Sequence, residues 1–228
     1  MSDRTNTLVL VRHGQSIWNR LNLFSGWADV ELTEEGRRQA MRAGRVLCEA
    51  GYDFDLCFTS YLKRSINTLD TILEQMGRSW LPVMRSWRLN ERHCGALQGL
   101  DKAKVTGGRR VAGRRAYDVR PPLLDPGDER DPYLQAAYRD VPADEIPMGE
   151  SLWDVEMRVW PYFEQEVAPR VLAGGRVLLV AHENLLRVLI GRLEGLDRER
   201  AVRIEIPNAR PIAYELAGDL SVVRRQLV

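Results

Sequence analysis

The chain contains three runs of consecutive apolar residues, and we interpret each run as a buried strand. They occupy residues 8–11, 56–58 and 177–180. Each run is apolar throughout rather than alternating, as expected for parallel strands covered on both faces of a sheet. Residues 81–83 and 212–216 predict two further strands, the second a candidate for an edge of the sheet.

The segments between these runs have the spacing of amphipathic helices. Thr33 can cap a helix that carries Glu34 and Glu35 near the positive end of its dipole and that stops at Gly51. Further helices fit residues 62–76, 151–171 and 185–196. Strands that alternate with helices predict a three-layer, doubly wound α/β domain, with helices on both faces of a mainly parallel sheet.

The stretch from about residue 102 to residue 147 breaks this pattern. It is rich in proline, glycine and charge and has little periodicity. Long irregular segments inside compact domains are usually functional or disordered. We therefore expect one domain over residues 1–228, with a loop-rich excursion at about 102–147 over the active site.

Composition narrows the class of protein. A formal net charge of +1 argues against a nucleic-acid partner. No apolar run approaches the roughly 20 residues that span a bilayer, and the amino terminus lacks the features of a signal peptide. We therefore expect a cytoplasmic protein with no membrane partner. The odd number of cysteines and the lack of a CxxC pair indicate neither a disulfide framework nor a zinc site.

Two of the three histidines occupy equivalent places. A single arginine separates His13 from the end of the first apolar strand. A single alanine separates His182 from the end of the strand at residues 177–180. Ligands bind at the carboxyl edge of an open α/β sheet, so both histidines are predicted to lie at a ligand site.

Cationic side chains around these histidines suit a phosphate group. Guanidinium groups bind phosphate oxygens in pairs and stabilise charge as it spreads in the transition state. Gly14 and Gly26 would let backbone amides approach the anion. The candidate cations are Arg12, Arg64, Lys102, Arg114 and Arg115.

A nucleophile and a proton donor complete the predicted chemistry. The neutral imidazole of His13 can attack phosphorus, and Glu91 could hand a proton to the leaving oxygen. Metal binding is the rival use of His13, His182 and Glu91, but the chain lacks paired-ligand spacing such as HxxxH.

At this point the motifs resemble a known family. Residues 10–16 (LVRHGQS) with Trp18 and Asn19 resemble the RHG signature of the histidine phosphatase superfamily. The motifs FSGW, LKRS, LNERH and GALQG look like those of the cofactor-dependent (2,3-bisphosphoglycerate-dependent) phosphoglycerate mutases; they occupy residues 24–27, 62–65, 89–93 and 95–99. The likeness runs from about residue 7 to residue 216.

The resemblance implies a role for each matching residue. His13 would be the phosphohistidine, Glu91 the proton donor and acceptor, and His182 a stabiliser of the transferring phosphoryl group, which Arg12 and Arg64 would grip. The residues implied to hold the substrate's phosphate and carboxylate are Asn19, Ser25, Gly26, Lys102, Arg114, Arg115 and Asn184. It also implies 2,3-bisphosphoglycerate as the phosphoryl primer, no metal, and a place in glycolysis and gluconeogenesis.

The departures from the family fall in the substrate pocket. Cys94 stands where the family usually has tyrosine, and Glu183-Asn184 stands where it has glycine-asparagine. A carboxylate beside a phosphate site repels a dianion unless it points away or meets a new cation. The segment between Lys102 and Arg114 is a few residues shorter, and the chain ends at Val228 without the family's lysine-rich tail.

Three functions therefore stay open. The first is a mutase that interconverts 2- and 3-phosphoglycerate. The second is a phosphatase that hydrolyses another small phosphate ester through the same phosphohistidine, which Cys94, Glu183 and the missing tail favour. The third is a non-catalytic phosphate-binding protein, which would have no need of a proton donor. Each takes a small phosphorylated metabolite as partner, and a homodimer stays open.

Overall fold

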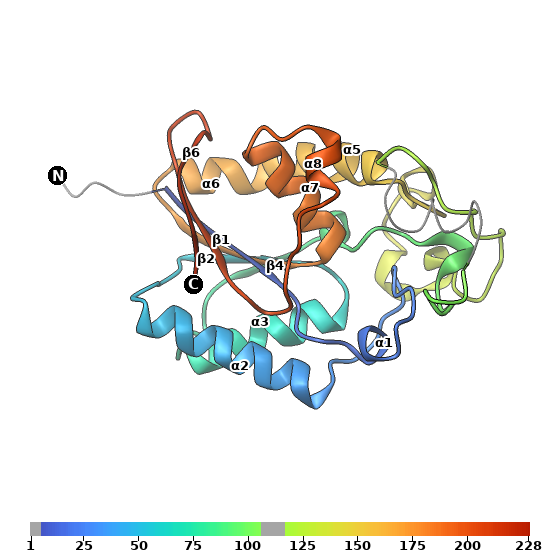
Figure 1. Ribbon diagram of the computed structural model, residues 1–228, viewed down its shortest axis with the longest axis horizontal. Coiled ribbons are helices and arrows are strands. Elements are labelled where there is room, and N and C mark those ends of the chain that lie inside the picture. The colour runs from blue at the N-terminus through green and yellow to red at the C-terminus, as the bar shows by residue number, and fades with distance from the viewer. Residues whose placement is uncertain (1–5, 106–116) are drawn as a thin grey trace.

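The computed structural model describes residues 6–105 and 117–228. Within these ranges, six strands form one mixed sheet in the order β3-β2-β4-β1-β5-β6 (Figure 1). Strands β1 to β4 are parallel, and β5 and β6 are antiparallel additions on one side. The strands are β1 (Asn6–Arg12), β2 (Leu56–Thr59), β3 (Val83–Arg85), β4 (Arg176–Ala181), β5 (Ile212–Leu216) and β6 (Val222–Leu227).

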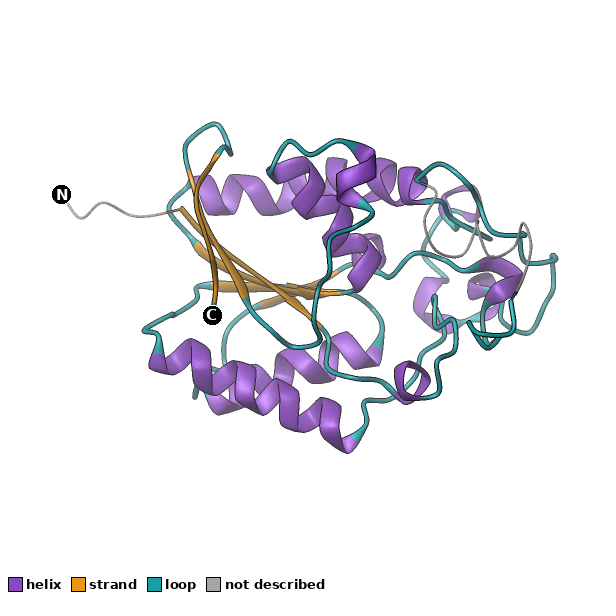
Figure 2. Ribbon diagram, viewed as in Figure 1, coloured by secondary structure: helices purple, strands orange, loops and turns teal. Residues whose placement is uncertain are grey.

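Helices cover both faces of the sheet. Figure 2 shows α2 and α3 on one side of the strands and α5, α6 and α7 on the other. The helices are α1 (Ile17–Arg20), α2 (Glu34–Glu49), α3 (Lys63–Gln75), α5 (Leu152–Tyr162), α6 (Ala168–Leu172), α7 (Glu183–Leu193) and α8 (Arg198–Ala201). The predicted three-layer, doubly wound fold is confirmed.

Strand β1 shows why its sequence is continuously apolar. Leu8 and Leu10 pack into the core shared with α5, α6 and α7, whereas Val9 and Val11 pack into the core shared with α2 and α3. All four side chains are fully buried. Because successive residues of a strand point to opposite faces, a strand between two helical layers needs an apolar residue at every position.

The prediction that residues 212–216 form an edge strand is wrong. β5 pairs with β1 on one side and with β6 on the other, so β6 is the edge. The sequence of β6, VVRRQL, is mostly exposed and carries two arginines. A charged edge of this kind discourages pairing with another chain, but it gives the strand no apolar pattern to recognise.

The helix expected over residues 151–171 is interrupted. α5 ends at Tyr162, a π-helical turn follows over Phe163–Val167, and α6 begins at Ala168. Pro161 and Pro169 lack the amide hydrogen of a regular helix, and the wider turn lies between them. The other predicted helices, now α2, α3 and α7, lie close to their predicted positions, whereas the short helices α1 and α8 were not predicted.

The described part of the loop-rich segment lies at the end of the molecule toward which the parallel strands point (Figure 1). This part of the chain forms short 3₁₀ turns at Pro132–Leu134, Ala136–Tyr138 and Ala143–Glu145. Among the described residues, no helix combines the length and apolar character that crossing a membrane requires.

Candidate active site

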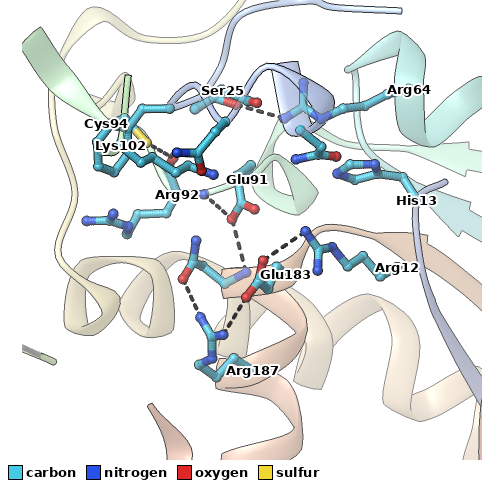
Figure 3. A pocket seen from close by; sticks show the side chains of 15 residues that line it. Arg12, His13, Ser25, Arg64, Glu91, Arg92, Cys94, Lys102, Glu183 and Arg187 are labelled. Carbon is cyan, nitrogen blue, oxygen red and sulfur yellow. Dashed lines mark hydrogen bonds and ion pairs between the residues drawn. The ribbon is translucent and has the colours of Figure 1, made fainter. Parts of the chain in front are cut away.

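A pocket of about 280 Å³ lies at the carboxyl edge of the sheet (Figure 3). Each of the four parallel strands leads toward it: β1 to His13, β2 to Arg64, β3 to Glu91 and β4 to Glu183. The lining residues are Arg12, His13, Asn19, Asn22, Phe24, Ser25, Gly26, Arg64, Glu91, Arg92, Cys94, Lys102, Glu183, Asn184 and Arg187.

The two histidines meet, as their matched strand ends predicted. The centroids of the His13 and His182 rings are 5.1 Å apart and the ring planes are tilted by 58°. The amide of His13 donates to the carbonyl of Ala181 at 2.9 Å, which extends the β1–β4 ladder beyond β1. The backbone of two parallel strands therefore fixes the histidine pair.

The surroundings of His13 leave one ring nitrogen reactive. Nδ1 lies 2.7 Å from the carbonyl oxygen of Gly14, so Nδ1 carries the proton and Nε2 keeps its lone pair. Burial, helped by the charges of Arg64 and Arg12, holds the pKa of His13 well below its usual value. The imidazole is therefore neutral at physiological pH, as a nucleophile must be.

His182 is held from the other side. Its Nε2 lies 2.8 Å from Oγ of Ser60, a contact that the sequence did not indicate. Burial, followed by the charge of Arg64, lowers the pKa of His182 well below its usual value. Within the described part of the chain, the buried Nδ1 has no hydrogen-bond partner.

Arg12 and Arg64 line the pocket, and each has one buried nitrogen without a hydrogen-bond partner among the described residues. Arg64 is fully buried and donates to the carbonyls of Ala28 and Gly26 at 2.8 Å each. Burial lowers the pKa of Arg64 to about 10, which still leaves it charged at neutral pH. Its Nε, the Nε of Arg12 and Oγ of Ser25 are buried without a partner among the described residues.

Two glycines shape the loop after β1. A Cβ on Gly14 would lie 2.3 Å from the carbonyl oxygen of Gly36, and one on Gly36 would lie 2.1 Å from that of Gln15. The amide of Gly14 donates to Oγ1 of Thr68, so the expectation that it approaches the anion is wrong. Its role is the close contact of this loop with the start of α2.

Glu91 projects into the pocket from the segment after β3 (Figure 3). Its Oε1 accepts hydrogen bonds from the amides of Arg92 at 2.8 Å and Asn184 at 3.2 Å. The side chain of Asn184 in turn accepts from Arg187 at 2.7 Å. These bonds orient the carboxylate through one oxygen and leave Oε2 as the atom that can carry a proton.

Glu183 meets the new cations that its position requires. Its carboxylate contacts Arg12 at 2.8 Å and Arg187 at 2.6 Å. Burial raises the pKa of Glu183, but Arg12 and Arg187 outweigh that effect, so the net shift is downward and the carboxylate stays charged. Arg187 was missed from sequence, although its place four residues after Glu183 on a helix suits an ion pair.

The remaining predicted ligands divide into two groups. Asn19, Ser25, Gly26, Cys94, Lys102 and Asn184 all line the pocket, whereas Arg114 and Arg115 lie outside the described residues. The ammonium of Lys102 lies 5.8 Å from the centroid of the Phe24 ring, and burial lowers its pKa. Asn22, Phe24 and Arg92 also line the pocket and were not predicted. Among the described residues, no group of three or more His, Cys, Asp or Glu side chains could hold a metal ion.

A histidine pair set among arginines, at the edge of an α/β sheet, defines a class of protein that handles phosphoryl groups. The chain belongs to the histidine phosphatase superfamily (branch 1), whose family model matches residues 8–127 and 124–226.

Close relatives specify the family within that superfamily. The 2,3-bisphosphoglycerate-dependent phosphoglycerate mutase of Treponema pallidum (strain Nichols) is 49% identical over 229 residues, which are 97% of this chain and 91% of the relative. A protein of the same name from Lachnoclostridium phytofermentans is 49% identical over 213 residues, covering 92% and 86%. The resemblance to the cofactor-dependent phosphoglycerate mutase family is therefore confirmed.

Solved structures agree on the fold. "Mycobacterial hydrolase 1" matches with a TM-score of 0.71 and 29% identity over 97% of this chain and 96% of that one. A mycobacterial glucosyl-3-phosphoglycerate phosphatase in complex with VO3 matches with a TM-score of 0.67 and 28% identity, over the same shares of the two chains.

Proposed function

We propose that the protein interconverts 2- and 3-phosphoglycerate by passing a phosphoryl group through His13. The proposal rests on a set of buried polar groups beside a neutral imidazole, contributed by Arg12, Ser25, Arg64 and His182, which have no hydrogen-bond partner among the described residues. Buried donors without partners are rare and costly, so they favour a bound acceptor. A phosphoryl group supplies the oxygens that these groups lack.

The pocket also suits the priming cofactor. 2,3-Bisphosphoglycerate would supply the first phosphoryl group to Nε2 of His13. Arg12 and Arg64 would bind the phosphate that reacts. Lys102, Asn19 and Asn184 would bind the groups at the other end of the molecule, together with Arg114 and Arg115.

His13 and Glu91 together account for every bond and proton that changes in the reaction. A hydroxyl oxygen of the substrate attacks phosphorus on His13, the P–N bond breaks, and its electron pair returns to Nε2. The Glu91 carboxylate takes the hydroxyl proton. When the doubly phosphorylated product has turned round, Nε2 attacks the other phosphorus, that P–O bond breaks, and Glu91 returns the proton to the leaving oxygen.

The charged groups of the pocket act on the transition state. Arg12 and Arg64 would stabilise the negative charge that spreads over the transferring oxygens, and His182 would donate to one of them from Nδ1. Preorganised donors in a water-poor site commonly contribute more than they do in water.

A phosphatase acting on another small phosphate ester is the second candidate. It would load His13 in the same way and release the phosphoryl group to water. The carboxylate of Glu183 in the pocket favours it, because it lowers the positive charge available to a doubly phosphorylated molecule. The phosphatase among the structural neighbours also supports it.

The test is to trap the phosphoryl group and to compare substrates. With labelled 2,3-bisphosphoglycerate, we expect a label on His13 that is lost in acid and kept in base, and we expect His13→Ala to abolish both label and turnover. A folded His13→Ala protein that keeps more than a few per cent of activity would end the assignment. Turnover of 3-phosphoglycerate against a panel of phosphate esters separates the mutase from the phosphatase.

A further inference from the structure

The segment that carries Glu91 has little regular structure of its own. The 3₁₀ turn Trp87–Leu89 precedes it, and the backbone is extended at Asn90. Its carbonyls and amides therefore need partners from elsewhere, because buried backbone groups are almost always hydrogen-bonded. Several of these partners come from a buried ion pair outside the pocket, formed by Arg158 of α5 and Glu150 just before α5.

Arg158 binds the segment on the amino-terminal side of Glu91. Its Nη1 donates to the carbonyl of Arg88 at 2.7 Å and to that of Asn90 at 3.3 Å. Its Nη2 lies 3.4 Å from the carbonyl of Glu91 itself. Trp27, whose ring lies beneath the Arg158 guanidinium at 5.7 Å, donates to the same Glu91 carbonyl at 2.5 Å.

Glu150 binds the segment on the carboxyl-terminal side. Its Oε2 accepts from the amide of His93 at 2.7 Å, and its own amide donates to the His93 carbonyl at 2.9 Å. The two side chains bind each other through two parallel bonds, from Nε at 2.7 Å and from Nη2 at 2.9 Å. The side chains of Arg158 and Glu150 are only 7% and 3% exposed.

The cost of burial makes a purely stabilising role a weak explanation. Taking two charges out of water costs several kcal/mol per ion, and apolar residues of similar volume often serve stability as well. A bidentate pair fixes direction as well as distance, and here it fixes backbone atoms on both sides of Glu91. A proton donor must lie within hydrogen-bond distance of the oxygen that it protonates, so the backbone that carries it must be held in place.

We propose that Arg158 and Glu150 are positioning residues for Glu91: they hold its segment so that the carboxylate meets the reacting oxygen. Neither side chain lines the pocket. The inference rests on the proposed function, since it assumes that Glu91 transfers a proton.

A double-mutant cycle tests the coupling. In the otherwise unmodified protein, Arg158→Lys and Glu150→Gln should each lower kcat for 3-phosphoglycerate by about 10- to 100-fold, with KM within about 3-fold, because part of the proton-transfer contribution is lost. In a Glu91→Gln background, the same changes should lower kcat by less than about 3-fold, because residues that act through one group are not additive. Equal losses in both backgrounds, or an unchanged kcat, would overturn the proposal.

Arg120 offers a matched control, because its partner Asp154 lies on the same helix as Arg158. It forms a bidentate pair with Asp154 at 2.7 and 2.5 Å, but it is mostly exposed and the contacts of this pair do not include the Glu91 segment. Arg120→Lys should leave kcat within about 2-fold, as surface ion pairs contribute little. Thermal unfolding of every variant identifies any that lost its fold. If Arg158→Lys does not fold, Glu150→Gln still tests the proposal, because glutamine has nearly the same shape as glutamate.

Hydrogen exchange separates failure of this inference from failure of the proposed function. Amide exchange across residues 89–93 should rise in Arg158→Lys and not in Arg120→Lys. If exchange rises but Glu91→Gln keeps full kcat, the positioning holds and the proton-donor role of Glu91 is wrong. Unchanged exchange would overturn the positioning itself.

Discussion

Glu91 is bound at one carboxylate oxygen by two backbone amides, which leaves the other oxygen available for a proton. A glutamine at this position keeps an acceptor oxygen for the amides of Arg92 and Asn184. It cannot release and recover a proton.

We therefore expect Glu91→Gln to lower kcat by about 10²- to 10⁴-fold, the usual worth of a general acid, with a small change in KM. Steady-state kinetics with 3-phosphoglycerate measure both constants. A raised KM with normal turnover at saturation would mean that Glu91 only helps to bind the substrate.

Glu183 neutralises two arginines at the rim of the pocket. Removing its carboxylate should free Arg12 and Arg187 for a second anionic group, since one charge pair at 4 Å is worth roughly 4 kcal/mol at an effective dielectric constant of about 20, before screening by solvent. This effect should be larger for a bisphosphate than for a monoester.

We expect Glu183→Gly to tighten 2,3-bisphosphoglycerate binding by about 10-fold and to raise the ratio of mutase to phosphatase rates. Glu49→Gln is the matched control, because it makes the same change in net charge at an exposed site on α2. If neither quantity moves in Glu183→Gly, this carboxylate has no influence on the choice of substrate.

At the scale of elements, the site depends on how closely the loop after β1 approaches α2. The amino-terminal turn of α2 admits no side chain at Gly36, since a Cβ there would lie 2.1 Å from the backbone oxygen of Gln15. Helix propensity alone favours alanine over glycine by about 1 kcal/mol. For an alanine at this position, helix propensity would stabilise the fold and the steric contact would destabilise it. We expect the steric contact to dominate, because a backbone atom cannot move aside as easily as the end of a flexible side chain.

Gly36→Ala should therefore lower the free energy of unfolding by about 1–3 kcal/mol and reduce activity by moving the loop that carries His13. Urea unfolding measures the first effect and kcat the second. Gly218→Ala, where an added Cβ meets nothing within 4 Å, should stay within about 0.5 kcal/mol of the unmodified protein. A stabilised Gly36→Ala protein would show that propensity wins.

Elements differ in how far the sequence could predict them. The strand ends at His13 and His182 were predictable because a run of apolar residues stops at a polar one. β6 was not, because its side chains face solvent and give no alternation. The interruption of the α5 segment depends on how the chain closes its hydrogen bonds around Pro161, which residue spacing does not reveal. Ser60 and Arg158 escaped notice because their role comes from contacts across the fold.

At the scale of the whole molecule, the three histidines share one property. Burial is the main cause that lowers the pKa of His13, His93 and His182 in the folded state, for His93 to about 4. In the unfolded chain each would titrate near its usual value of about 6.5. Below that pH the unfolded state binds more protons than the folded one, so acid favours unfolding.

The free energy of unfolding should therefore fall as pH decreases below about 6.5, with a slope approaching roughly 4 kcal/mol per pH unit if all three histidines contribute. The contribution of His93 ends near pH 4, where its folded form also binds a proton. Urea unfolding at pH 8, 7, 6 and 5 gives the slope. A constant free energy of unfolding between pH 7 and pH 5 would contradict this account.

The central place of β1 has a consequence for biosynthesis. The strand that leads to His13 has β4 and β5 as its two neighbours, and both come from the last quarter of the chain. While a ribosome is still making the middle of the protein, β1 has emerged with neither partner available. Its apolar residues then need protection until about residue 216 is free to pair. The first residues of the site to be translated are thus among the last to be fixed in place, and folding should be slow for a domain of this size.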